Sequence, residues 1–187
     1  MNQLDIVQEW DGLSQIISDR LKDQPYLSTI KETETLELTA TIHSLENAFA
    51  QNELNTGQII LQNLQNQIEN FQPFNPSMIL WAYKDQSQTI FLTLKNKTCQ
   101  MRITPKQGAS SLGKTLRAAK FLLKTENHFF NPNEIIGYSQ KSSGEFRQTK
   151  VIQIHFNNGQ TSENITGPES KQIISILKLA KIPELSL

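Results

Sequence analysis

Hydrophobic residues recur every three to four positions through the first 72 residues, a spacing that places them along one face of a helix. The pattern predicts a helix over residues 2–22, a second over about 31–51 and a third that ends near residue 71. Residues 52–57, which end in glycine, are expected to form the turn between the second and third helices. The segment therefore predicts a helical hairpin within a small bundle.

The hydrophobic period changes from 3.6 to 2 after a segment that contains Pro73 and Pro76. Such alternation is typical of strands with one buried face. Asn158-Gly159 favours a type I′ hairpin turn, in which both central residues have positive φ. We expect strands over residues 78–84, 88–95, 98–104, 134–140 and 149–156, and a short returning strand over 160–165.

Two helices are expected among these strands. The first spans about 110–125. The second begins at Thr166-Gly167-Pro168-Glu169, which has the spacing of a capping box with proline in the first turn, and it ends before Pro183. The predicted fold class is α+β, with a helical N-terminal region followed by a mainly antiparallel sheet with two helices. Because three strands and a helix occur twice, over 78–125 and 134–181, an internal duplication is a hypothesis.

The zero net charge of the 187-residue chain conceals an asymmetry, because residues 1–75 carry a net charge of −8 and residues 76–187 a net charge of +8. A split of this size indicates two different surfaces and two structural units. We predict an acidic helical region over residues 1–73 and a basic α+β domain over 78–187.

The single cysteine, Cys99, cannot form an internal disulfide, which is typical of a reducing cytoplasm. No apolar run is long enough to span a membrane, and the N-terminus lacks the basic start and apolar stretch of a secretory signal. These observations predict a soluble, cytoplasmic protein without a membrane partner.

Residues 108–115, Gly-Ala-Ser-Ser-Leu-Gly-Lys-Thr, match G-x-x-x-x-G-K-[ST] and so resemble the phosphate loop of nucleoside triphosphatases. The resemblance implies phosphate contacts by the backbone at both glycines and by Lys114, and a magnesium contact by Thr115. That family also has a buried parallel strand before the loop and a later aspartate for magnesium, whereas no aspartate follows Asp85. The alternative is a loop that caps an ordinary helix, whose N-terminus attracts anions.

Sequence spacing assembles no catalytic or metal-binding set. No two of His43, His128 and His155 are three or four residues apart, and one cysteine cannot complete a zinc cluster. The chain has no G-x-S-x-G elbow, although a Ser–His–acid triad can assemble in space from any spacing. We predict a protein that is not an enzyme and that uses no metal or cofactor.

Positive charge is concentrated in residues 95–150, which hold 11 bases and 3 acids. On the predicted helix 110–125, the bases lie on one face with Phe121 among them. A basic surface with an exposed aromatic suits single-stranded nucleic acid, and the element order is similar to that of Whirly and PUR-type single-strand binders. The candidate nucleic-acid-binding or anion-binding residues are Arg102, Lys114, Arg117, Lys120, Phe121 and Lys124.

Two functions remain, and the absence of assembled catalytic residues favours the first. In the first, the chain is a non-catalytic accessory or adaptor protein that binds a protein partner through the helical hairpin and the sheet edge. In the second, the basic C-terminal domain binds single-stranded nucleic acid. Nucleotide binding at residues 108–115 is a third possibility. The sequence leaves the identity of the partner and the oligomeric state open.

Overall fold

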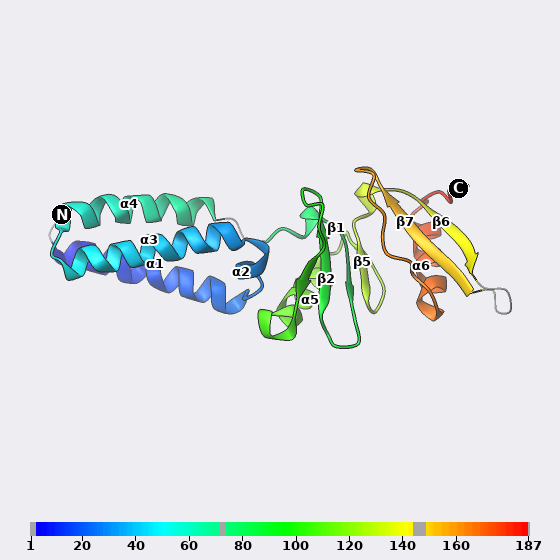
Figure 1. The fold of residues 1–187 in the computed structure, drawn as a ribbon, viewed down its shortest axis with the longest axis horizontal. Coiled ribbons are helices and arrows are strands. Elements are labelled where there is room, and N and C mark those ends of the chain that lie inside the picture. Colours follow the sequence, from blue (N-terminus) through cyan, green and yellow to red (C-terminus); the bar gives the residue numbers. More distant parts are fainter. Residues whose placement is uncertain (1–2, 72–73, 144–148, 187) are drawn as a thin grey trace. The chain divides into compact units, whose positions relative to one another are not determined.

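The computed structural model describes residues 3–71, 74–143 and 149–186, and it has the predicted α+β architecture (Figure 1). Its contacts divide the chain into two compact units. The first, which we name the helical unit, comprises residues 1–74 together with 106–111. The second, which we name the sheet unit, comprises residues 75–105 and 112–187.

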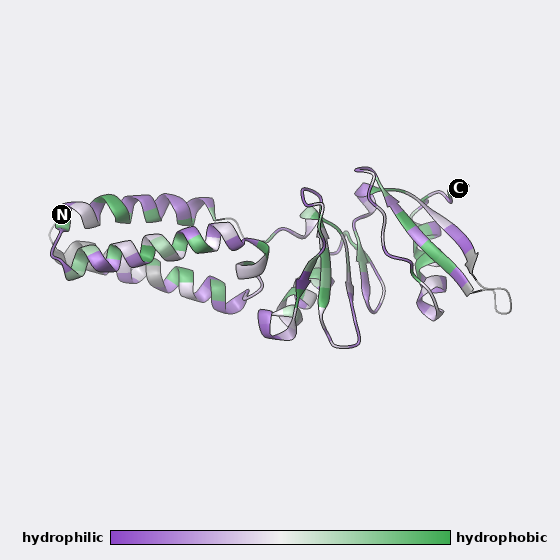
Figure 2. Ribbon diagram, in the orientation of Figure 1, coloured by the Kyte–Doolittle hydropathy of each residue, from purple (hydrophilic) through white to green (hydrophobic). Residues whose placement is uncertain are grey.

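The helical unit contains one short and three long helices, which are α1 (Gln3–Asp23), α2 (Leu27–Ile30), α3 (Glu32–Ala50) and α4 (Leu54–Asn70). The three long helices lie side by side (Figure 1), and each alternates between apolar and polar residues along its length (Figure 2). The predicted helical bundle is therefore confirmed. Its buried apolar side chains include Ile17, Leu38, Leu45, Leu61, Leu64 and Ile68.

The turn between α3 and α4 is shorter than the sequence predicts. Helix α4 already begins at Leu54, and the N–H of Gly57 donates to the Glu53 carbonyl oxygen inside the helix. Asn52 has a φ of 58°, and the N–H of Glu53 donates to the carbonyl oxygen of Ala48, as in a Schellman motif. Because asparagine tolerates this left-handed conformation, the reversal does not need the glycine.

The larger sheet of the sheet unit has five antiparallel strands in the order β3-β2-β1-β5-β4. The strands are β1 (Ile79–Lys84), β2 (Ile90–Leu94), β3 (Met101–Ile103), β4 (Leu123–Lys124) and β5 (His128–Phe130). Helix α5 (Ala109–Ala118) lies beside this sheet (Figure 1). Its Leu112 and Leu116 are fully buried, as are Ala82, Ile90 and Leu92 on the strands. The apolar face of α5 thus covers one face of the sheet.

Among the described residues, three short 3₁₀ helices, each beginning with a proline, connect strands and helices. Asn75 and Asn131 cap two of them by accepting a hydrogen bond from the N–H two residues later. Proline suits this position because its fixed φ matches the first helical residue. The three segments are Pro76–Met78, Pro105–Gln107 and Pro132–Glu134.

The helix predicted over residues 110–125 ends at Ala118, and the prediction is wrong beyond that residue. Residues 123–124 form β4 instead, and they pair with β5, which lies where no strand was predicted. This hairpin buries Phe129 and Phe130, which are 1% and 2% exposed. No glycine or proline marks the end of this helix. The helix ends there because the tertiary burial of these rings outweighs the local helical pattern.

The second sheet pairs β6 (Ile135–Ser143) with β7 (Thr149–Phe156), in a register that runs from Ile135–Phe156 to Ser143–Thr149. Helix α6 (Pro168–Leu179) follows. Buried residues of the hairpin and of α6 form one cluster with Trp81 and Phe130 of the larger sheet. The other members of this cluster include Tyr138, Ile152, Ile154, Phe156, Ile173 and Leu177.

The internal duplication stays a hypothesis, because the described second copy has only two of its three predicted strands. Strands β1, β2 and β3 form a meander that α5 follows. After β6 and β7, the returning strand predicted over 160–165 is reduced to two isolated bridges, Ile152–Ile165 and His155–Thr161, before α6 begins. The two copies also differ in what pairs with them after their helices. Strand β5 pairs with β1 of the first meander and β4 pairs with β5, whereas Tyr138 of β6 forms a parallel bridge with Glu184.

The turn after β7 is not the type I′ turn that Asn158-Gly159 predicts. Gly159 has a φ of 80°, but Asn158 is not among the residues with positive φ. The N–H of Phe156 donates to the carbonyl oxygen of Gln160, and the N–H of Gly159 donates to that of Phe156. These bonds fit a three-residue loop that ends in a left-handed glycine, which is a common hairpin connection.

The backbone at Gly108 lies close to Pro25 and Tyr26, and a substitution at Gly108 tests this contact. It has a φ of 90°, and a β-carbon there would lie 2.5 Å from Cγ of Pro25 and 3.0 Å from the nitrogen of Tyr26. Gly108→Ala should therefore lower the free energy of unfolding by about 2 to 4 kcal/mol, from a clash added to backbone strain. Urea denaturation followed by circular dichroism measures the loss.

Gly159→Ala is the matched control for this variant. Its φ of 80° is similar, but no heavy atom lies within 4 Å of a β-carbon there. Only the backbone strain remains, so we expect a loss of about 1 to 2 kcal/mol. Equal losses in the two variants would contradict a close contact with Pro25.

Candidate functional site

The structure distributes the six candidate basic-surface residues over separate elements. Lys114 and Arg117 lie on α5, Lys120 and Phe121 in the turn that follows, and Lys124 on β4. Arg102 lies on β3, where it pairs with Phe91 of β2. Since neighbouring residues of a strand point to opposite faces, Arg102 lies on the face away from Ile103 and α5. The single basic helix face predicted from the sequence does not form.

Two of these cations are engaged with the backbone around the end of α5. The ammonium of Lys124 donates to the carbonyl oxygens of Arg117, at 2.7 Å, and Ala119, at 3.0 Å. The guanidinium of Arg117 donates to the carbonyl oxygen of Glu126, at 2.8 Å, and lies 5.8 Å from the centre of the Phe129 ring. Cations favour a helix C-terminus, so both residues stabilise the junction between α5 and the β4–β5 hairpin.

The other three residues near this junction remain open to solvent. Lys114 and Lys120 are exposed, and the side chain of Phe121 is 42% exposed. We name Lys114, Lys120 and Phe121 the α5 surface. It consists of an exposed aromatic ring and two exposed ammonium groups on α5 and directly after it.

The G-x-x-x-x-G-K-T segment does not form a phosphate loop. Helix α5 begins at Ala109, so Gly113, Lys114 and Thr115 lie inside the helix, where backbone N–H groups bond to the preceding turn. The preceding strand, β3, is an edge strand of an antiparallel sheet and not the central parallel strand that such loops require. The hydroxyl of Ser111 donates to the carbonyl oxygen of Asp23 at 2.9 Å, within the helical unit.

A row of four residues crosses the larger sheet on the face away from α5. Arg102 of β3 pairs with Phe91 of β2, Phe91 pairs with Tyr83 of β1, and Tyr83 pairs with His128 of β5. We name these four residues the cross-strand row. Arg102 is exposed, whereas the three ring residues are half-buried. Exposure therefore decreases from the β3 edge towards the centre of the sheet.

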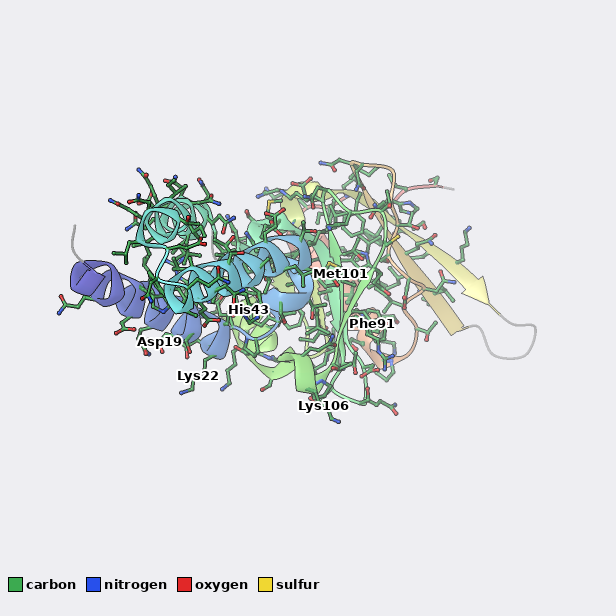
Figure 3. The ribbon with its side chains drawn as sticks, turned by 60° about the vertical axis from the view of Figure 1, so that its left-hand side comes forward. Asp19, Lys22, His43, Phe91, Met101 and Lys106 are labelled. Atoms are coloured by element: carbon green, nitrogen blue, oxygen red, sulfur yellow. The ribbon has the colours of Figure 1, made fainter. Side chains whose placement is uncertain are left out.

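The rings of the cross-strand row stack on one another. The ring centres of Phe91 and Tyr83 are 4.8 Å apart with planes inclined by 7°, and those of Tyr83 and His128 are 6.0 Å apart. Trp81 stacks on Tyr83 at 5.5 Å from the buried side. Figure 3 shows Phe91 projecting from β2. Stacked rings cover one another's faces and leave their edges open, so the row presents a rigid apolar surface that suits the binding of another chain.

Acidic groups surround the cross-strand row. Burial, the Glu163 carboxylate that accepts a hydrogen bond from the phenol, and the charge of Asp85 together raise the pKa of Tyr83 to about 12. A hydrogen bond from Ser87, opposed by desolvation and helped by two backbone N–H groups and the charge of Arg102, lowers the pKa of Asp85. Carboxylates therefore lie close to Tyr83, and Arg102 is the cation at the open end of the row.

The closed end of the row is held by Glu169, in the first turn of α6. Its carboxylate accepts hydrogen bonds from the Thr125 hydroxyl and from the Asn127 N–H, and it lies 2.9 Å from Nδ1 of His128. Burial raises the pKa of Glu169, but the hydrogen bonds from Thr125 and His128 outweigh it and lower the pKa to about 2. The predicted capping box does not form, because this carboxylate binds the β4–β5 turn and Gly167 caps α6 without a side chain.

His155 makes the other histidine contact of interest in the sheet unit. It is half-buried, and its Nε2 lies 2.9 Å from the hydroxyl oxygen of the buried Ser139. In the part of the chain that the structure describes, no carboxylate hydrogen-bonds to either residue. The pair therefore lacks the third member that orients the base in a catalytic triad.

Sequence reasoning did not identify the cross-strand row. The signal available was alternation, since Trp81 and Tyr83 are two residues apart and share a face. Which residues of β2, β3 and β5 stand opposite them depends on the strand register, and β5 was not predicted at all. The row could therefore be found only once the pairing was known.

Comparisons with known proteins found no match to a family model, to a curated protein or to a solved structure. Among the described helices, none is long and apolar enough to cross a membrane. Within residues 3–71, 74–143 and 149–186, no three His, Cys, Asp or Glu side chains gather so that they could hold a metal ion.

Gly113→Ala tests whether residues 108–115 form a helix or a phosphate loop. A β-carbon at Gly113 would lie 3.5 Å from Cδ1 of Ile90, which is ordinary contact. Alanine should raise the free energy of unfolding by about 0.5 to 1 kcal/mol, since glycine is a poor helix former. A thermal melt measures the gain, and a marked loss of stability would contradict a helix at this position.

Glu169→Gln should reduce the dependence of stability on acidic pH. A carboxyl whose pKa is about 2 in the folded protein, against 4.5 for a free glutamate side chain, stabilises the fold above pH 4.5 and loses this contribution as pH falls towards 2. After allowance for solvent screening we expect about 1 to 2 kcal/mol at neutral pH. Urea denaturation at several pH values between 7 and about 2 measures it.

Glu126→Gln provides the control for this pH series. Glu126 lies in the same turn, but its exposed side chain makes no described hydrogen bond, and only its backbone carbonyl is used, by Arg117. The control should retain the wild-type pH profile. A Glu169→Gln profile parallel to that of the wild type between pH 4.5 and about 2 would contradict the role of this carboxylate.

Proposed function

We propose that this protein is a non-catalytic accessory protein that binds a protein partner along the β3 edge of its larger sheet. The observation that carries the proposal is the cross-strand row, whose rings are stacked and whose open end, Arg102, lies on an edge strand. An edge strand offers backbone groups to an extended segment of another chain, and alternate side chains of that segment then contact the sheet face. Phe91 and Arg102 are the residues of the row nearest to such a segment.

The charge around the row favours a protein segment over a nucleic acid. The charges of Asp85 and Glu163 help to raise the pKa of Tyr83, so both carboxylates lie close to the row. They would repel the phosphate groups of a nucleic acid bound there. A neutral peptide meets no such penalty, and a carboxylate of the peptide can pair with Arg102 at the open end of the row. The row thus supports the protein-binding function, and Arg102 is the one residue that it shares with the set from which nucleic-acid binding was inferred.

Nucleic-acid binding is a second candidate, and a different observation favours it. On the α5 surface, Phe121 is 42% exposed beside the exposed Lys120. A base could stack on this ring while the ammonium groups contact phosphates. The C-terminus of α5, however, carries negative partial charge that phosphate groups avoid, and the cations Arg117 and Lys124 are already bound to carbonyl oxygens there.

The protein-binding proposal can be tested from Cys99, which is exposed and two residues before β3. As the sole cysteine, it can carry a benzophenone maleimide on the full chain without any other substitution. Irradiation in lysate should crosslink a partner, which mass spectrometry identifies. Arg102→Glu should reduce the yield of this crosslink about tenfold, through a reversed charge at the binding edge.

Lys120→Glu is the matched control, because it makes the same charge change at an exposed base on the α5 surface. It should leave the crosslink yield unchanged. Equal reductions of the crosslink yield in the two variants would contradict the proposal. So would the finding that Arg102→Glu reduces no crosslink.

The second candidate predicts binding to a fluorescein-labelled oligothymidine that weakens steeply between about 50 and 200 mM salt. Lys120→Glu should weaken this binding further. Arg102→Glu should not, since Arg102 lies on the face of the sheet away from α5. Fluorescence anisotropy with the full chain measures both effects. No saturable binding at the lower salt concentration would eliminate this candidate.

A further inference from the structure

A polar groove lies between α3 and α4 of the helical unit, with a volume of about 250 Å³. Its walls carry two carboxylates from α3 and four carboxamides from α4, and none of its lining residues is a base. Figure 3 shows the dense polar side chains around these helices. The wall residues are Glu34, Glu37, Asn63, Asn66, Gln67 and Asn70.

The floor of the groove is apolar and already accommodates a cation at one side. It is formed by Leu38, which is 4% exposed, and Phe71, which is 6% exposed. The Lys31 ammonium lies 4.9 Å from the centre of the Phe71 ring and 4.0 Å from Oε1 of Glu34. An aromatic face beside a carboxylate is a favourable environment for positive charge.

Two acceptors of the groove remain without a partner in the described part of the chain. The carboxylate of Glu37 makes no described ion pair or hydrogen bond. The Oε1 atom of Gln67 is buried without a hydrogen-bond donor. Rotation of the last side-chain bond of Gln67, which is soft, would turn this oxygen to a ligand in the groove. The groove therefore offers a negative charge and a carboxamide acceptor above an apolar floor.

We propose that this groove binds an arginine side chain of a partner protein. A guanidinium is planar and carries five donors, so it can bond Glu37 and Gln67 together while its stem covers Leu38. The net charge of −8 over residues 1–75 attracts a basic segment. The proposal goes beyond the protein-binding function at β3, because it concerns other residues in the other unit.

The test is an NMR titration of the full chain with N-acetyl-arginine amide, observed at the side-chain amides of Asn63, Asn66, Gln67 and Asn70. We expect saturable shifts with a Kd on the order of 1 to 10 mM, which is usual for a single side chain. The citrulline derivative has nearly the same shape without charge, and it should give no saturable shift. The lysine derivative should bind more weakly, since its ammonium lacks the planar arrangement of donors with which a guanidinium bonds two neighbouring acceptors.

Glu37→Gln should weaken the binding of N-acetyl-arginine amide about tenfold. Glu46→Gln removes an exposed carboxylate further along the same helix, outside the groove, and should leave the affinity unchanged. Equal effects of the two variants would show general attraction to an acidic surface and would overturn the proposal. So would equal shifts with citrulline, or no saturation up to about 50 mM. Arg102→Glu should not change this titration, so the two proposals can fail separately.

Discussion

The pairing of β1 with β2 on one side and β5 on the other determines most of what the sheet unit presents to its surroundings. Ala82 points towards α5, and its neighbours Trp81 and Tyr83 therefore point to the opposite face. A shift of one residue in this register would exchange the two faces. The burial of Ala82, Ile90 and Leu92 under α5 fixes the register, and the cross-strand row is its consequence.

Glu169 connects this row to the second half of the sheet unit. A carboxylate in the first turn of a helix usually favours its own helix N-terminus. Here it accepts hydrogen bonds from Thr125 and Asn127 and contacts His128, so α6 is attached to the β4–β5 turn. The attachment closes the row at His128 and leaves it open at Arg102. A partner that binds the row would therefore approach it from the Arg102 end.

The charge asymmetry of the sequence does not translate into one acidic and one basic surface. Lys124 and Arg117 bind carbonyl oxygens around the end of α5, and Lys95 pairs with Glu134. The row on the sheet unit is surrounded by carboxylates, as is the groove of the helical unit. The net charge of +8 over residues 76–187 therefore does not make the proposed surface of the sheet unit uniformly basic.

The sequence by itself determined the helices and strands that have a regular period. Helices α1 and α3 and strands β1 and β7 begin and end within one or two residues of their predicted bounds, because each buries one face and so repeats its apolar residues. It also determined the α+β class, since the period changes from 3.6 to 2 after the proline-containing segment near residue 75.

Only the tertiary structure decided where α5 ends and which residues share a surface. The helical pattern continues to residue 125, but Lys124 and the buried Phe129 and Phe130 stabilise a hairpin whose contacts are distant in sequence. Five of the six basic-surface candidates were predicted from one helical face, so ending the helix at Ala118 separated them. Strand register produces the cross-strand row, and the pairing of α3 with α4 produces the groove. Register and helix pairing depend on contacts between residues distant in sequence, and a local sequence pattern does not contain this information.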